Sequence, residues 1–185
     1  MGTVHLITGG VKSGKSGHAL QLATEFAGDS PVRFIATAHR GIGDDSLDRR
    51  IRRHVAERPG HWILFEPPAG LVEAVGTGGD EVMAIVDCVT LWVGDLVSAP
   101  DYSHEAGISR HLDELVDAFR LSDRPVIVIT NEVGWGVAPP TAVGNDFADE
   151  LGNANRVIAE AADRVTLLVA GQPLQIKPRA AFDSG

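Results

Sequence analysis

The stretch Gly9-Gly10-Val11-Lys12-Ser13-Gly14-Lys15-Ser16 decides the fold, and it follows directly on the apolar run Val4-His5-Leu6-Ile7-Thr8. It fits the pattern G-x-x-x-x-G-K-[ST], in which the glycines let several backbone N–H groups point at one anion. In this pattern Lys15 would reach the β- and γ-phosphates of a nucleotide, and Ser16 would hold Mg²⁺. The stretch therefore predicts a loop that binds a nucleoside triphosphate. The alternative is an ordinary glycine-rich turn between a strand and a helix.

Apolar runs of strand length alternate with helical patterns along the chain. The run Val126-Ile127-Val128-Ile129 is apolar at successive positions, which is typical of a strand covered on both faces. Strands are expected at 4–8, 33–36, 81–86, 125–130 and 164–170, with a shorter piece at 174–176. Helices are expected at 15–27, 45–57, 103–121 and 146–162. This alternation predicts an α/β fold of the P-loop NTPase type, with a mostly parallel sheet and helices on both faces.

Length and composition narrow the function classes. The 185 residues suggest one domain over the whole chain, with a tail after Pro178 that has little to bury. A formal net charge of −9 without a basic face argues against a nucleic-acid partner. No apolar run approaches the roughly 18 residues of a membrane span, and the first residues lack a signal-peptide pattern, so we expect a cytoplasmic protein.

The cysteine and histidine content bears on metal and thiol chemistry. The single cysteine, Cys88, excludes an internal disulfide, and its place beside an apolar strand favours a buried thiol over a nucleophile. Five histidines show no metal-ligand spacing, so we expect no zinc site. These histidines are His5, His18, His39, His104 and His111.

A phosphate-binding loop needs an acidic partner for its metal ion. Asp87 follows the apolar run Val82-Met83-Ala84-Ile85-Val86. Because the ends of parallel strands converge on one crevice, its carboxylate is placed to reach the Mg²⁺ held by Ser16. The alternative is an ordinary aspartate that ends a strand.

Several segments together resemble a known family. They are Gly9 to Ser16, Ile35-Ala36-Thr37, Arg50-Ile51-Arg52-Arg53-His54, Arg58-Pro59 with Trp62, Asp87-Cys88-Val89-Thr90-Leu91-Trp92 and Thr130-Asn131-Glu132-Val133-Gly134. In this order, over nearly the whole chain, they resemble the bifunctional adenosylcobinamide kinase/adenosylcobinamide-phosphate guanylyltransferases. The segment Asn131-Glu132-Val133-Gly134 is far more specific than the phosphate-binding loop alone.

The resemblance implies two reactions at one enzyme. Members of the family phosphorylate the aminopropanol hydroxyl of adenosylcobinamide and then transfer GMP from GTP onto that phosphate, in the assembly of the coenzyme B12 nucleotide loop. The transfer passes through a histidine–GMP intermediate, and His54 is the corresponding histidine. A neutral imidazole is a competent nucleophile at neutral pH. Lys15 is then the catalytic residue of the kinase step. The resemblance also implies ATP or GTP as phosphate donor, a corrinoid substrate and a homotrimer.

Further residues are implied as nucleotide contacts. Ala36, Thr37, Ala38 and Glu66 would hold the guanine nucleotide, while Arg52, Arg53 and Val55 would surround its phosphates. With Asp87 and each residue of the loop Gly9, Gly10, Val11, Lys12, Ser13, Gly14, Lys15 and Ser16, they make up the expected nucleotide site. Glu132 would orient the acceptor or the metal, or would only cap local structure.

The chain departs from the family pattern at four positions. Ser46 stands where an acidic residue is usual, Ala148 and Asn153 stand where arginine is common, and Lys12 replaces an arginine. Two alternatives therefore remain. One is a kinase without guanylyltransferase activity, and the other is a nucleotide-dependent binding or regulatory module.

Overall fold

The architecture comes from a computed structural model that describes residues 2–38, 58–66, 70–76 and 78–178. The expected helix 45–57 and the tail after Pro178 lie outside the described residues. The strands are β1 Val4–Gly9, β2 Val32–Ala36, β3 Ile63–Phe65, β4 Met83–Asp87, β5 Val126–Ile129, β6 Arg164–Val169 and β7 Gln172–Lys177. The helices are α1 Lys15–Ala27, α3 Leu71–Gly76, α4 Val89–Ser98, α5 Ser109–Leu121 and α6 Ala142–Ala161.

The strands form one sheet in the order β3-β2-β4-β5-β1-β6-β7. All neighbours pair in parallel except β6 and β7, which form an antiparallel hairpin at one edge. The carboxyl ends of β1, β2, β4 and β5 consequently lie along one edge of the sheet. This is the mostly parallel α/β sheet that the alternation of runs predicts.

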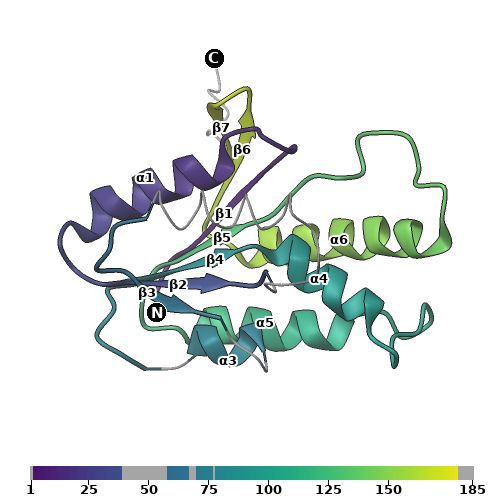
Figure 1. The fold of residues 1–185 in the computed structure, drawn as a ribbon, viewed down its shortest axis with the longest axis horizontal. Coiled ribbons are helices and arrows are strands. Elements are labelled where there is room, and N and C mark those ends of the chain that lie inside the picture. The colour runs from purple at the N-terminus through teal and green to yellow at the C-terminus, as the bar shows by residue number, and fades with distance from the viewer. Residues whose placement is uncertain (1, 39–57, 67–69, 77, 179–185) are drawn as a thin grey trace, which may run out of the picture.

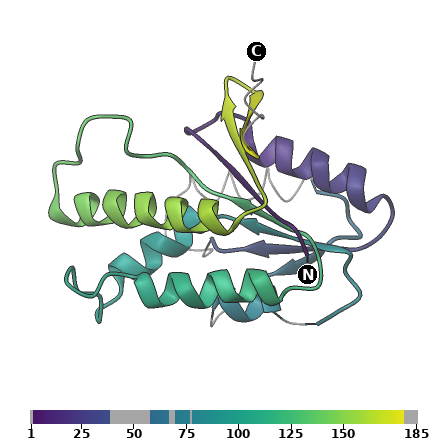
Figure 2. The same cartoon turned by 180° about the vertical axis from the view of Figure 1, so that it is seen from behind.

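Helices cover both faces of the sheet (Figure 1). On one face α1 packs through Ala19, Ala23 and Ala27 against strand residues such as Ile85 and Ile127. Alanine at every fourth position lets the helix backbone approach the sheet closely. On the other face α3, α4, α5 and α6 share a second apolar cluster with the alternate strand residues, and the view from behind shows the same separation (Figure 2). Among the described residues, no helix is long and apolar enough to span a membrane.

The sequence-based prediction of elements is mostly confirmed, with identifiable errors. The helix expected from Ser103 begins at Ser109, because Gly107 adopts a φ of 58° and its N–H closes a turn onto the Ser103 carbonyl. The helix expected from 146 begins four residues earlier, where the Thr141 hydroxyl caps it by accepting from the N–H of Gly144. The prediction missed the short elements β3 and α3, and also α4, whose residues are apolar on most sides.

A buried ion-pair network ties the opposite edge of the sheet, where β2, β4 and β5 begin. Glu81 Oε2 accepts from Arg33 at 3.1 Å and from Arg124 at 2.9 Å, and all three side chains are at most 7% exposed. Arg33 also donates to the carbonyls of Ala74 and Gly78. Burial alone would raise the pKa of Glu81, but hydrogen bonds from its own backbone and from the two arginines outweigh it and lower that pKa.

We expect Glu81→Gln to lower the free energy of unfolding by about 3 kcal/mol at pH 7, because it leaves two buried guanidiniums without their counter-charge. Since the folded-state pKa of Glu81 is depressed, the difference from the wild type should be complete above the ordinary value of 4.5 and shrink as the pH falls below it. Urea denaturation over this pH range measures both effects. Glu114→Gln, which breaks an exposed pair with Arg110, is the control and should change little. An equal loss in both variants would contradict the stabilising role of Glu81.

Candidate nucleotide and acceptor site

The predicted phosphate-binding loop connects β1 to α1 at the carboxyl edge of the sheet (Figure 1). Its backbone takes conformations that residues with a side chain rarely adopt, with φ angles of 147° at Gly9, 58° at Lys12 and 99° at Gly14. Gly14 is the N-cap of α1, so the N-terminal N–H groups of that helix face the loop. A helix N-terminus of this kind attracts phosphate through its N–H groups and its dipole.

Backbone contacts leave no room for a side chain at Gly9 and little room at Gly14. A Cβ on Gly9 would lie 2.5 Å from the Leu168 carbonyl oxygen, and one on Gly14 would lie 3.3 Å from the Cα of Gly171. The N–H of Gly171 donates to the Ser13 carbonyl at 2.9 Å. The β6–β7 turn therefore supports the loop from behind. Sequence reasoning missed this role of Gly171, although a glycine directly after a strand is a signal of a tight turn.

Lys15 lies inside the loop. Lys15 is 7% exposed, and its Nζ donates to the Gly10 carbonyl at 2.7 Å and to Ser13 Oγ at 3.5 Å. The ammonium group is thus held at the concave side of the loop, where the phosphates of a nucleotide would bind. Ser16 follows on the first turn of α1 and is partly exposed. Val11 and Lys12, at the tip of the loop, are exposed.

Asp87 and Glu132 share the edge with the loop. β5 pairs with both β1 and β4, so the residues that follow β5 lie between Gly9 and Asp87. Two strand spacings, roughly 10 Å, separate β1 from β4. Glu132 is attached to the loop directly, because its N–H donates to the Gly9 carbonyl at 3.2 Å. Sequence reasoning predicted the place of Asp87 but left the role of Glu132 open.

A chain of polar side chains fixes the Glu132 carboxylate. Its Oε1 accepts from the Thr8 hydroxyl at 2.6 Å and from Asn155 Nδ2 at 3.3 Å. Asn155, buried on α6, also accepts from the Thr130 hydroxyl at 2.7 Å and donates to the Asn131 carbonyl. One amide side chain thus joins α6 to the end of β5.

Thr90 anchors the same segment to α4. Its hydroxyl oxygen accepts from the backbone N–H of Asn131 at 2.8 Å and from Asn131 Nδ2 at 3.1 Å. With the contacts of Asn155, these bonds fix residues 130–132 from two helices. A buried polar network in which every member is paired holds its side chains in one orientation.

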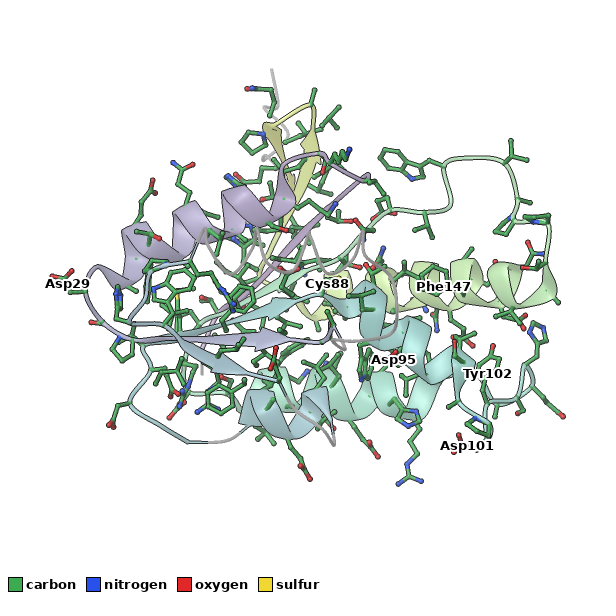
Figure 3. All side chains as sticks on the ribbon, in the orientation of Figure 1. Asp29, Cys88, Asp95, Asp101, Tyr102 and Phe147 are labelled. Atoms are coloured by element: carbon green, nitrogen blue, oxygen red, sulfur yellow. The ribbon has the colours of Figure 1, made fainter. Side chains whose placement is uncertain are left out.

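Cys88 lies between the end of β4 and the start of α4 (Figure 3). Its backbone is held by Thr37, whose hydroxyl accepts from the Cys88 N–H at 2.9 Å and donates to its carbonyl at 2.7 Å. Burial, with a smaller effect of the Asp87 carboxylate, raises the pKa of the Cys88 thiol to about 11. The thiol is therefore protonated at neutral pH, which disfavours the nucleophile reading.

The residues expected to hold guanine lie farther along the same edge. Ala36, Thr37 and Ala38 are at the end of β2, three strand spacings or roughly 14 Å from β1. Glu66 directly follows β3, beyond β2, and is exposed. The structure thus places these four residues away from the phosphate-binding loop. Arg52, Arg53, His54 and Val55 lie outside the described residues, as does Ser46.

The donor set at the loop fits a magnesium ion. A serine hydroxyl and an aspartate carboxylate are hard oxygen ligands, and Mg²⁺ usually takes only one or two protein ligands beside phosphate and water. Ser16 and Asp87 would be those ligands. No cluster of three or more His, Cys, Asp or Glu residues within the described ranges is arranged to hold a metal ion on its own.

Relatives in sequence cover nearly the whole chain. The bifunctional adenosylcobalamin biosynthesis protein CobP of Pseudomonas aeruginosa is 38% identical over 93% of this chain and 96% of the relative. The bifunctional adenosylcobalamin biosynthesis protein CobU of Salmonella typhimurium is 34% identical over 93% of this chain and 98% of the relative. The CobU protein of Escherichia coli is 33% identical with the same coverage.

Solved structures share the fold at much lower identity. The flagellar accessory protein FlaH from Methanocaldococcus jannaschii has a TM-score of 0.51 and 14% identity, over 92% of this chain and 74% of that one. A solved ATPase domain has a TM-score of 0.52 and 14% identity, over 89% and 68%. These likenesses concern the fold alone. The family model described as cobinamide kinase / cobinamide phosphate guanyltransferase matches residues 5–176, and this protein belongs to that family.

Proposed function

We propose that this protein phosphorylates adenosylcobinamide and then transfers GMP from GTP onto the new phosphate, giving adenosyl-GDP-cobinamide for the coenzyme B12 nucleotide loop. One observation carries the proposal: the phosphate-binding loop, Asp87 and the fixed Glu132 carboxylate share one sheet edge in a chain that matches the family over residues 5–176. A single domain carries both reactions. The relatives from Pseudomonas aeruginosa and Salmonella typhimurium are named bifunctional adenosylcobalamin biosynthesis proteins.

In the kinase step the chain mainly positions charge. The loop N–H groups and Lys15 bind the phosphates of ATP or GTP, and Lys15 offsets the negative charge that spreads over the transferring γ-phosphoryl group. Mg²⁺, held by Ser16 and Asp87, would supply further charge neutralisation at the phosphate oxygens when bound. These residues bring the donor and the acceptor hydroxyl into line.

Glu132 is placed to serve the acceptor. The hydroxyl oxygen of the aminopropanol arm bonds to the γ-phosphorus, the bond to the bridging oxygen breaks, and a nucleoside diphosphate leaves. The hydroxyl proton then passes to the Glu132 carboxylate, which the hydrogen bonds from Thr8 and Asn155 hold in one orientation. Of the three roles that the sequence left open for Glu132, we therefore favour orientation of the acceptor.

In the guanylyl step His54 is the nucleophile. A ring nitrogen of His54 bonds to the α-phosphorus of GTP, pyrophosphate leaves, and an oxygen of the cobinamide phosphate then displaces the histidine from that phosphorus. Arg52, Arg53 and Val55 would contact the phosphates, with Ala36 to Ala38 and Glu66 at the guanosine. The distance between the ends of β1 and β2 supports a guanine position separate from the phosphate-binding loop.

The proposal also covers the oligomeric state of the protein and its location in the cell. We expect a homotrimer in the cytoplasm, in which neighbouring subunits complete the site for the large acceptor. A kinase without guanylyltransferase activity is the second candidate, because Ala148 and Asn153 on α6 stand where arginine is common in the family. Asn153 Oδ1 instead accepts from Arg156 of the same helix at 3.0 Å.

We expect Lys15→Ala to lower kcat/KM for cobinamide phosphorylation by at least about a hundredfold, because the γ-phosphoryl charge loses its cation. Initial rates with ATP and with GTP, at saturating Mg²⁺, measure the loss and identify the preferred donor. Lys177→Ala is the matched control, since Lys177 donates to the carbonyls of Ala159 and Glu160 far from the loop. Unchanged phosphorylation in Lys15→Ala would remove the loop as the kinase site.

We expect His54→Ala to abolish covalent guanylylation while phosphorylation continues. Protein incubated with Mg²⁺ and with GTP labelled at the α- or the γ-phosphate, then denatured, should retain only the α-label. That label should be lost in His54→Ala and kept in His111→Ala, which replaces an exposed histidine on α5. A wild type that retains no label but still phosphorylates cobinamide would favour the kinase-only candidate.

We expect Glu132→Gln to lower kcat for phosphorylation by about a hundredfold, because an amide cannot accept the hydroxyl proton. The α-label on His54 should form normally, since that step needs no acceptor hydroxyl. Glu160→Gln, at an exposed position on α6, is the control. Normal phosphorylation together with a lowered melting temperature would assign Glu132 a structural role only.

A further inference from the structure

The segment that leads from β5 to α6 has no role in the chemistry described so far. It comprises residues 133–140, which read Val133-Gly134-Trp135-Gly136-Val137-Ala138-Pro139-Pro140. Its three large apolar side chains are all exposed, Val133 at 38%, Trp135 at 70% and Val137 at 98%. Three large apolar side chains exposed within five residues form a candidate interaction surface.

Both ends of this segment are fixed, and one end is fixed to the phosphate-binding loop. Before it, Glu132 is bonded to Thr8 and Gly9, while Asn131 is bonded to Thr90. After it, Thr141 caps α6. In Figures 1 and 2 the segment extends beyond the sheet edge at which β1 and β5 end. The segment therefore begins next to the proposed kinase site and extends away from it.

The reach of the chain bounds the distance from Trp135 to the site. Three residues of extended chain span at most about 11 Å, so the Cα atoms of Trp135 and Glu132 are no farther apart than that. The N–H of Glu132 lies 3.2 Å from the Gly9 carbonyl oxygen. The body of a large acceptor whose hydroxyl is at the phosphate-binding loop can therefore reach Trp135.

The charge of the segment also suits one class of ligand. The chain carries a formal net charge of −9, yet residues 133–145 contain no charged side chain. The body of a corrinoid is a broad macrocycle with methyl groups and neutral amide arms. Tryptophan offers such a ring a large rigid apolar face together with one N–H donor for an amide oxygen.

We propose, on the basis of the function proposed above, that Trp135 and Val137 form the corrinoid-binding surface of the kinase site. Trp135 packs against the apolar face of the corrin ring, and Val137 extends the contact. The segment holds the body of the substrate while the aminopropanol arm reaches past Glu132 to the γ-phosphate. Trp135 thereby selects a corrinoid over a simple amino alcohol.

Binding and kinetics of Trp135→Ala test this inference. We expect the KM for adenosylcobinamide, and its Kd from equilibrium dialysis, to rise about tenfold, the effect of removing one aromatic anchor. The kcat, the Kd for GTP and the melting temperature should remain near the wild-type values, since the Trp135 side chain is 70% exposed and lies outside the phosphate-binding loop. Trp135→Phe should keep most of the affinity. Leu121→Ala, which truncates an 81% exposed apolar side chain at the end of α5, should have no effect.

Other outcomes would overturn the inference. Unchanged affinity for adenosylcobinamide in Trp135→Ala would remove Trp135 from the acceptor site, and an equal loss of GTP affinity would make the segment a support of the nucleotide site instead. If Trp135→Ala changes the molar mass of the protein measured by light scattering, the segment is an interface between copies of this chain. If the wild-type protein neither binds nor phosphorylates adenosylcobinamide, the proposed function itself is refuted. Measurements on the wild type therefore separate a failure of the proposed function from a failure of the role given to Trp135.

Discussion

The close approach of two backbone segments behind the phosphate-binding loop is the constraint on which the site depends. Gly9 lies so near the Leu168 carbonyl that no Cβ fits between them, and Gly14 lies against the Cα of Gly171. The hydrogen bond from Gly171 to the Ser13 carbonyl closes the same contact. These backbone contacts, with the bond from Lys15 Nζ to the Gly10 carbonyl, hold the loop in place, and α1 starts at Lys15, directly after Gly14. The β6–β7 hairpin, the one antiparallel pair of the described sheet, serves as its support.

Polar side chains fix the position of Glu132, as the close backbone contacts of the glycines fix the position of the phosphate-binding loop. Asn155 joins Thr130, the Asn131 carbonyl and Glu132, so that β5 and α6 cannot shift relative to each other without breaking three hydrogen bonds, one of them buried. Thr8 extends the network to β1. Since residues 130–132 directly precede the segment 133–140 that carries Trp135, the orientation of the carboxylate and the position of the apolar surface depend on the same few bonds.

How far the sequence predicts this arrangement depends on the range of the interactions involved. The phosphate-binding loop, the apolar strands and the place of Asp87 follow from local patterns, because successive apolar residues and a glycine-rich loop each determine their own backbone. The contact between Gly171 and the loop joins residues far apart in the chain, and so does the Asn155 network; no local pattern contains them. β3 and α3 are too short to show a period, and the apolar residues of α4 gave no polar face to mark a helix.

The spacing of the strands bears on how one edge serves two nucleotide reactions. The end of β1 holds the phosphate-binding loop, the end of β5 holds Glu132, and the end of β4 holds Asp87, in that spatial order. The end of β2, with Thr37 bonded to Cys88, lies one strand farther on, roughly 14 Å from the loop. The proposed guanine position is therefore separate from the loop, with Asp87 and Glu132 between the two. Under the proposed function both reactions would thus use one edge of the sheet, and the Glu132 carboxylate that orients the acceptor would lie between the two nucleotide positions.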